Sequence, residues 1–400
     1  MKECIRCLYT SQHPFGLDFN SEGLCTGCIT HDEKFTLDWD NRFKILESRV
    51  SEILAAKDRN AQYDCVIPIR GTPEYFYVVD VMKNKLGLKP LVVAYNTQFN
   101  SEPGVRNVDL IREVFDVDYV QYTSSPTIYK KLIRETLNKL NSMRWPFLAG
   151  YTQFPVQIAA EKGIPLVVWP YHQPTEQAGM HSYTELNEMT RRGRHDFDLM
   201  GLEPHELIDV GTLIHPSEVE DIHYPSNSDL KKNSIVGIYL SNYMPWDSRR
   251  YSEEMIAKYG ASAAKNKRTF DTYDRIDDKT YMTIHDILKQ AKLGYSRVTD
   301  NLCREIRFKR ISKEDARNIE KYYQASYPKK EIEFFLKWLG MKYEGFKWYL
   351  DHLPHSVNEE ETDTVTLNEV QRKFIDSFIV NHADVHQTED YIVYGKGLWV

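Results

Sequence analysis

The sequence predicts an α/β protein with a doubly wound parallel sheet, a small cysteine-rich head and a helical C-terminal lobe. Three features indicate this class. Apolar, β-branched stretches alternate with helical patterns from residue 63 to residue 240, as they do in doubly wound domains. Four cysteines stand in two pairs near the N-terminus. Helical periodicity then dominates residues 252–353. We expect four parts, at residues 1–45, 46–240, 241–355 and 356–400.

The composition disfavours several classes of partner. The chain has 400 residues and a formal net charge of −7. It has no dominant block of lysine or arginine, so nucleic acid and anionic membranes are poor candidates. The N-terminus lacks the apolar segment of a signal peptide, and no run of eighteen apolar residues occurs. We therefore expect a cytoplasmic protein without a membrane span.

The head contains two C-x2-C motifs, Cys4 with Cys7 and Cys25 with Cys28, separated by seventeen residues. This spacing is close to that of zinc ribbons, in which each pair presents two thiolates to a tetrahedral ion. Zinc bound by four thiolates would be structural, because no coordination position remains for water. It would also help a head of about forty residues to fold. A redox pair or disulfides are the alternatives.

The first strand–loop–helix–strand unit contains the loop that is most informative about function. We expect a strand at Cys65–Ile69, a loop at Arg70–Tyr75, and a second strand at Leu91–Ala94. Thr72 is expected to cap the helix, with Pro73 at its first position. A parallel sheet would place a ligand at this carboxyl edge. The loop is either an altered anion site, with Arg70 as its cation, or an ordinary helix start without a ligand.

Two other polar groups have open interpretations. His172, Glu176 and His181 could form an acid–base set on one loop, or they could be structural or surface residues. The basic cluster at Arg191–His195 is either a solvated helix end or a binding site for phosphate or a sugar carboxylate. Sequence spacing does not decide between these interpretations, and we assign no catalytic residue.

Several segments resemble the PP-loop N-acetyl sugar amidotransferases of bacterial surface-glycan synthesis, of the PseA and WbpG type. The cysteine head is shared, Pro245-Trp246-Asp247 is similar to the family's G-Y-Y-I-P-W-D, and Arg297-Val298-Thr299-Asp300 is similar to G-R-A-T-D. The resemblance covers about residues 1–350. It implies an adenine nucleotide hydrolase-like PP-loop ATPase domain. It also implies substrate contacts, which we assign to Trp246, Asp247, Arg297, Thr299 and Asp300.

The sequence departs from the family at both loops that would contact ATP. The family's S-G-G-K-D-S corresponds here to Arg70–Tyr75, and its W-G-E-N-P corresponds to a stretch beginning Trp169-Pro170-Tyr171-His172. A phosphate cradle needs glycines and free N–H groups at a helix start. Pro73 has no N–H, and Glu74 can occupy the positive end of the helix. We assign the degenerate nucleotide or anion site to Arg70, Gly71, Thr72, Glu74, Trp169 and His172.

The resemblance implies that intact relatives use ATP, with Mg²⁺, to activate the amide oxygen of an N-acetyl sugar. Ammonia from a glutaminase subunit then converts acetamido to acetamidino. Our first hypothesis is a diverged amidotransferase of lipopolysaccharide O-antigen or nonulosonic (pseudaminic) acid biosynthesis. The second is an inactive subunit that binds the sugar and pairs with a glutaminase or an active paralogue; self-association stays open. An RNA-modifying PP-loop enzyme is a third, disfavoured by the acidic charge.

Overall fold

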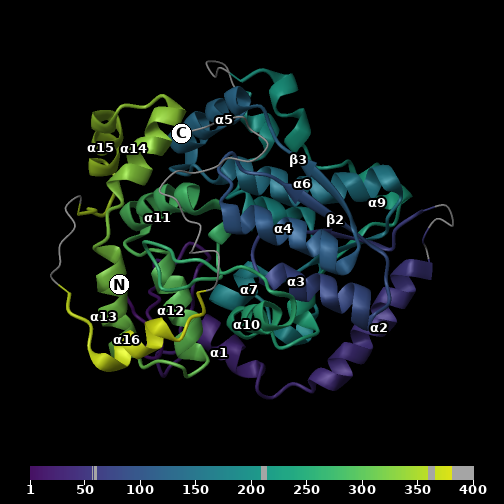
Figure 1. The fold of residues 1–400 in the computed structure, drawn as a ribbon, viewed down its shortest axis with the longest axis horizontal. Coiled ribbons are helices and arrows are strands. Elements are labelled where there is room, and N and C mark those ends of the chain that lie inside the picture. Colours follow the sequence, from purple (N-terminus) through teal and green to yellow (C-terminus); the bar gives the residue numbers. More distant parts are fainter. Residues whose placement is uncertain (56, 58–60, 209–213, 359–364, 381–400) are drawn as a thin grey trace. The chain divides into compact units, whose positions relative to one another are not determined.

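The computed structural model describes residues 1–55, 57, 61–208, 214–358 and 365–380 (Figure 1). The chain forms two compact units. Unit 1 comprises Met1–Thr36, Gln173–Thr184 and the described part of Ala263–Thr388, whereas unit 2 comprises Leu37–His172 and Glu185–Ser262. Unit 1 therefore contains both the cysteine head and the C-terminal helices. The acidic linker expected from Glu359 and the apolar end expected at Tyr391–Val400 lie outside the described residues.

Unit 2 is built on a parallel sheet, as the alternating pattern predicted. Its described strands are β1 (Cys65–Pro68), β2 (Pro90–Tyr95), β3 (Asp118–Tyr122), β4 (Leu166–Trp169) and β5 (Val236–Tyr239). Their order is β3-β2-β1-β4-β5, and every neighbouring pair is parallel. The order reverses between β1 and β4, which confirms the doubly wound arrangement. In such sheets the carboxyl ends at this reversal form the usual ligand crevice.

Helices enclose this sheet because its central strands are apolar on both faces. Every residue of β1, β2 and β4 is buried, as expected for strands covered on two sides. The longer helices of unit 2 are α2 (Trp39–Ala55), α4 (Glu102–Phe115), α5 (Pro126–Leu140), α6 (Trp145–Lys162) and α10 (Ser248–Tyr259). The shorter ones are α3 (Glu74–Val79), which continues as a π-helical turn at Asp80–Lys85, α8 (Arg191–Gly193) and α9 (Asn227–Lys232).

Helix α6 begins earlier than the sequence predicted, and the difference shapes the site. The sequence predicts a helix at Phe154–Glu161, but the helix begins at Trp145 and passes through Pro155. Pro146 fits the first turn, where its missing N–H has no intrahelical partner in any case. The added turns hold Phe147 and Tyr151 close to the sheet's edge, because α6 packs against β1, β2 and β4.

Unit 1 is mainly helical, which confirms the predicted C-terminal lobe. Within it, α1 packs against both α7 and α12, and α11 packs against α14. No helix in the described part of the chain combines the length and apolarity needed to cross a bilayer. The helices of unit 1 are α1 (Thr26–Glu33), α7 (Gln173–Ala178), α11 (Lys279–Leu293), α12 (Arg297–Arg307), α13 (Lys313–Gln324), α14 (Lys329–Leu339), α15 (Tyr343–Asp351) and α16 (Glu369–Asp376).

Candidate functional site

The loop after β1 starts its helix without the predicted cap. Helix α3 begins at Glu74, Pro73 is its N-cap, and no side chain accepts a capping hydrogen bond. The assignment of Thr72 as N-cap was wrong, because its hydroxyl accepts no capping hydrogen bond; the N–H of Tyr75 donates to the Thr72 carbonyl instead, at 3.2 Å. The Thr72 hydroxyl is buried and has no hydrogen-bond partner among the described residues. A polar atom is thus left over at the carboxyl edge of the sheet.

Gly71 is needed for close packing within unit 2. A Cβ atom there would lie 2.1 Å from the carbonyl oxygen of Gly104 in the first turn of α4. Asn107 of the same helix donates from Nδ2 to the Gly71 carbonyl at 3.0 Å. The close approach that a phosphate would exploit in the family loop is here made by protein backbone. Together with the missing N–H of Pro73, this does not fit the family's phosphate cradle.

Two arginines lie beside one aromatic ring at this edge. Arg70 is buried, and its guanidinium carbon is 4.7 Å from the ring centre of Phe147. Arg144 lies 5.7 Å from the same ring. Phe147 stacks on Tyr151 with ring centres 5.3 Å apart, and the Tyr151 hydroxyl hydrogen-bonds that of Tyr75 at 2.7 Å. Arg70 is therefore part of an ordered cation and aromatic cluster.

The second predicted loop meets the same cluster. Trp169 ends β4, and its ring lies 5.4 Å from that of Tyr151. Its indole N–H is buried without a hydrogen-bond partner among the described residues. His172 is buried too, and its ring lies 4.7 Å from that of Tyr239 at the end of β5. The structure thus brings Arg70, Trp169 and His172 to one edge of the sheet.

Asp198 is a candidate functional residue that sequence reasoning missed. Burial raises the pKa of the Asp198 carboxyl to about 7, although Arg194 and Arg144 act in the opposite direction. Its charge also acts on Tyr151 and Tyr239, which belong to the cluster. A lone aspartate four residues after Arg194 gave no sequence signal, since its proximity to the sheet edge depends on the fold. A carboxyl that titrates near neutrality is suited to general acid or base chemistry.

The basic cluster at Arg191–His195 is divided in the structure. Arg192 is exposed, whereas Arg194 is buried and paired with Glu203 at 3.0 Å. Arg194 also donates from Nε to the hydroxyl of Thr152 at 3.0 Å. Neither interpretation from the sequence describes this residue. Its guanidinium forms a buried ion pair within unit 2, and its Nη2 atom has no hydrogen-bond partner among the described residues.

Trp246 and Asp247 have structural contacts within unit 2. Trp246 is buried, with its ring 5.3 Å from Tyr251 and 5.6 Å from Tyr171. Asp247 is the N-cap of α10 and accepts the backbone N–H of Arg250 at 3.3 Å. Their contact with a sugar stays a prediction, because these packing and capping contacts explain both residues without a ligand.

The Arg-x-Thr-Asp segment opens α12 in unit 1, and two of its three polar side chains are occupied. The Thr299 hydroxyl donates to Glu320. Asp300 accepts the Tyr9 hydroxyl at 2.9 Å and pairs with Lys289. Glu176, from the suggested acid–base set, is likewise engaged, with Lys34 Nζ 2.6 Å away. These contacts favour structural roles for Thr299, Asp300 and Glu176.

The four head cysteines converge in unit 1. Their sulfur atoms all lie within 4.8 Å of one another and are buried. Cys4 and Cys28 are 3.8 Å apart, and Cys7 and Cys25 are 3.7 Å apart. Thiolates at ~2.3 Å from a tetrahedral zinc ion would be separated by about 3.8 Å. The donor set therefore fits a metal such as zinc.

Arg307 connects this cluster to the chain that follows β4. It donates to the carbonyls of Glu176 at 2.9 Å and Gln177 at 2.8 Å, and its Nη2 lies 3.9 Å from the sulfur of Cys25. Thr26 of α1 adds a bond from its hydroxyl to the Ala178 carbonyl at 2.6 Å. Hydrogen bonds therefore join the cysteine cluster to residues 173–184 within unit 1.

The family comparison agrees with the resemblance read from the sequence. Residues 253–370 match the family described as the C-terminal domain of WbpG-like LPS biosynthesis proteins. The chain therefore carries a WbpG-like C-terminal domain, and the predicted relationship to the WbpG type is confirmed. The match includes the Arg-x-Thr-Asp segment and ends at residue 370.

Individual relatives are more distant. The uncharacterized protein MJ1599 of Methanocaldococcus jannaschii is 22% identical over 117 residues, which cover 29% of this chain and 40% of that protein. The chain thus spans about two fifths of the length of this curated relative.

Two solved structures were also aligned with the chain. The NH3-dependent NAD synthetase of Campylobacter jejuni, in complex with nitrate, is 13% identical, with a TM-score of 0.29, over 50% of this chain and 96% of that one. An NMN synthetase of Francisella tularensis is 12% identical, with a TM-score of 0.26, over 56% and 93%. At these scores the fold assignment rests on the strand order of the sheet itself.

Proposed function

We propose that the protein is an amidotransferase-like protein of surface-glycan biosynthesis that acts on an N-acetyl sugar. The WbpG-like domain at residues 253–370 is the observation on which the proposal depends. It is supported by the carboxyl edge of the sheet, where Arg70 and Arg144 flank Phe147 and where Asp198 titrates near neutrality. Structural zinc in the cysteine head and ammonia from a glutaminase partner complete the proposal.

The chemistry requires a cation and a base at the same place. When an acetamido group becomes acetamidino, the amide oxygen must be activated, ammonia must add to the carbon, and the oxygen must leave with its activating group as an anion. Arg70 and Arg144 would stabilise the negative charge of that leaving group. Asp198 would accept the proton that the attacking nitrogen loses, since a base with a pKa near 7 is half available at neutral pH.

A second candidate is a sugar-binding subunit without turnover, which pairs with an active paralogue or a glutaminase. One observation favours it. The loop that cradles phosphate in the family is occupied here by the backbone of Gly104 and lacks an N–H at Pro73. ATP would then be bound elsewhere or not at all, and the edge of the sheet would recognise only the sugar.

Calorimetric titration of the zinc-loaded full chain with Mg-ATP separates the two candidates. If the edge activates its substrate with ATP, binding should be saturable and at least tenfold weaker in Arg70→Ala, because a charge-assisted contact is lost. Arg192→Ala, which removes an arginine whose side chain is 91% exposed, should bind like the wild type. An absence of binding heat at millimolar ATP, from protein whose far-UV circular dichroism spectrum shows that it is folded, would refute ATP-driven amidation. The binding subunit would then be the remaining candidate.

A further inference from the structure

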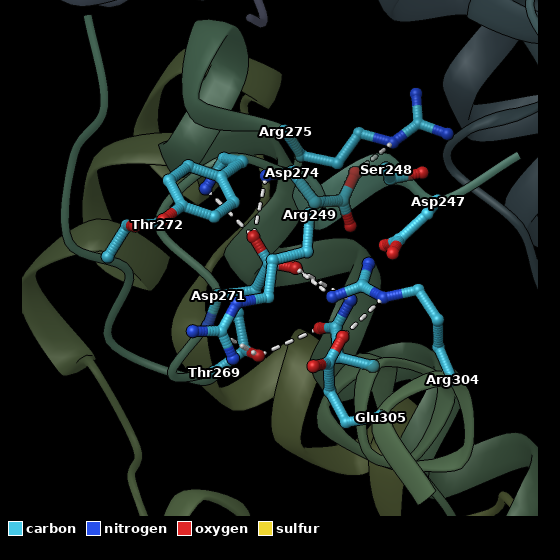
Figure 2. Close-up of polar contacts among 12 residues, drawn as sticks. Asp247, Ser248, Arg249, Thr269, Asp271, Thr272, Asp274, Arg275, Arg304 and Glu305 are labelled. Atoms are coloured by element: carbon cyan, nitrogen blue, oxygen red, sulfur yellow. Dashed lines mark hydrogen bonds and ion pairs between the residues drawn. The ribbon is translucent and has the colours of Figure 1, made fainter. Parts of the chain in front are cut away.

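Several buried charges in the WbpG-like domain are paired within unit 1. Figure 2 shows one such network, in which Asp271 accepts the backbone N–H groups of Tyr273 and Asp274 and pairs with Arg304 at 2.7 Å. Arg304 also reaches Glu305 at 2.8 Å. Each carboxylate in this network therefore has a cation and hydrogen-bond donors, as stable buried charges require.

A second pair, Arg268 with Asp286, follows the same rule. The two residues are almost fully buried, and Nε of Arg268 lies 2.6 Å from Oδ2 of Asp286. Arg268 further donates to the side chain of Gln290 and to the carbonyl of Ser326. The remaining carboxylate oxygen of Asp286 accepts the backbone N–H of Arg297 at 2.5 Å.

Arg297 lacks such a pairing. The residue is only 8% exposed, and its Nε and Nη1 atoms are buried with no hydrogen-bond partner among the described residues. Both carboxylate oxygens of Asp286 accept other hydrogen bonds, one from the Arg268 side chain and one from the Arg297 backbone N–H. The group of Arg268, Asp286 and Arg297 is thus left with one excess positive charge.

A second polar atom is left over at the same helix start. Ser296, the N-cap of α12, is completely buried, accepts no capping bond, and its hydroxyl has no partner in the described part of the chain. A buried guanidinium without a counter-charge is destabilising, and an unsatisfied buried hydroxyl adds to that cost. Such a cost at adjacent residues is explained when a ligand supplies the missing acceptors.

We propose that Ser296 and Arg297 form an oxyanion site that holds a phosphate or carboxylate group carried by the substrate. A guanidinium gives such a group charge-assisted, geometrically specific bonds, and a hydroxyl can donate one more. Thr299 and Asp300 of the same segment do not touch the ligand. They fix the start of α12 through Glu320, Tyr9 and Lys289.

This site deepens the proposed function and rests on it for the identity of the substrate. It adds that the N-acetyl sugar carries an anionic group, a phosphate or a carboxylate, and that Ser296 and Arg297 hold this group. The site belongs entirely to unit 1, whereas Arg70 and Asp198 belong to unit 2. A failure of ATP binding at Arg70 would therefore not contradict the oxyanion site. A failure of anion binding at Arg297 would likewise not contradict ATP binding at Arg70.

Thermal unfolding of the full chain tests the site without any need for turnover. Inorganic phosphate and glucuronate are titrated separately against sodium chloride of equal ionic strength. We expect Tm to rise with at least one of them, since a ligand of the folded state stabilises it. A response to phosphate indicates a phosphate-bearing sugar, and a response to glucuronate indicates a sugar acid.

Two variants locate the response. In Arg297→Gln, the affinity for the anion should fall at least tenfold, and Tm without anion should rise because an unpaired buried charge is removed. Ser296→Ala should weaken anion binding several-fold. If Arg297→Gln fails to fold, the Tm response of Ser296→Ala is the test of the site. Arg317→Gln, at a side chain that is 40% exposed, should retain the wild-type response, and Arg70→Gln should retain at least part of it.

Three outcomes would overturn the site. The first is a wild-type Tm that depends on ionic strength alone. The second is an anion response that persists in both Arg297→Gln and Ser296→Ala. The third is an anion response that disappears in Arg70→Gln, since this would place the anion at the edge of the sheet in unit 2.

Discussion

At the scale of single residues, burial and hydrogen bonding decide which polar side chains are available to bind or react with a ligand. Asp198 has an ordinary sequence context, yet its surroundings keep its carboxyl protonated close to neutrality. Asp247 is the reverse case, since a motif points to it but its carboxylate caps α10. The same contrast separates Arg297 from Thr299 within one segment. Residue type alone therefore does not identify a site.

The pKa of Asp198 gives a stability prediction with a defined sign. Because the folded pKa of about 7 exceeds the ordinary 3.8, the folded state binds this proton more tightly than the unfolded chain. Stability is lost as the pH rises between these values. Asp198→Asn lacks that loss, so above pH 7 it should be more stable than the wild type by about 2–4 kcal/mol. Urea denaturation from pH 4 to pH 8 measures the difference.

The difference between Asp198→Asn and the wild type should shrink steadily toward pH 4, because the wild-type carboxyl then stays protonated in the folded state and is increasingly protonated in the unfolded state. Asp109→Asn, at a side chain that is 63% exposed, is the matched control and should show little dependence on pH. A difference that stays constant across the range would mean that Asp198 titrates normally.

At the scale of elements, the loop after β1 is held by its neighbours more than by its own helix. Gly71 packs on the first turn of α4, and Asn107 bonds to its carbonyl and also to the carbonyl of Ser262. The start of α6 at Trp145 then places Phe147 beside Arg70. The candidate site is therefore a product of three elements that meet at the end of β1.

Gly71→Ala should destabilise the protein by about 2–3 kcal/mol, because the new Cβ would lie 2.1 Å from backbone that cannot move aside easily. The midpoint of urea unfolding measures this effect. Gly345→Ala is the control, since that glycine lies in helix α15 with its nearest contact at 4.0 Å and should be neutral or slightly stabilising. Equal stability of the two variants would show that the loop after β1 shifts to accommodate the added methyl group.

At the scale of the molecule, the cysteine cluster organises the N-terminal part of unit 1. Lys34 pairs with Glu176 at 2.6 Å, and Arg307 lies between the cluster and the carbonyls of α7. In the sequence, residues 173–184 directly follow the loop that contains His172. Loss of the metal should therefore destabilise residues 173–184, which are far from the cysteines along the chain.

Cys28→Ser should abolish stoichiometric zinc and release both α1 and residues 173–184, because about 10 kcal/mol of binding free energy no longer holds the head. Hydrogen exchange measured by mass spectrometry, together with elemental analysis, checks this. Cys65→Ala, which alters a buried thiol of β1 outside the cluster, should keep its zinc. Unchanged protection of α1 in a zinc-free Cys28→Ser protein would contradict the coupling.

The sequence by itself determined the features that depend on neighbours in the chain. The strands expected at Cys65–Ile69 and Leu91–Ala94 match β1 and β2 to within one residue at each end, and the cysteine spacing predicted the four-sulfur cluster. The WbpG-like segments were recognisable because they are short and contiguous. Periodicity and spacing record local geometry, and local geometry decides these elements.

Only the tertiary structure decided which polar groups are left without partners. The sequence could place Arg70 after a strand, but it could not bring Arg144 to the same ring. It could align Arg297 with a motif, but not show that Asp286 is already occupied. Charge balance and desolvation depend on residues distant in sequence, and these two quantities distinguish a binding residue from a structural one.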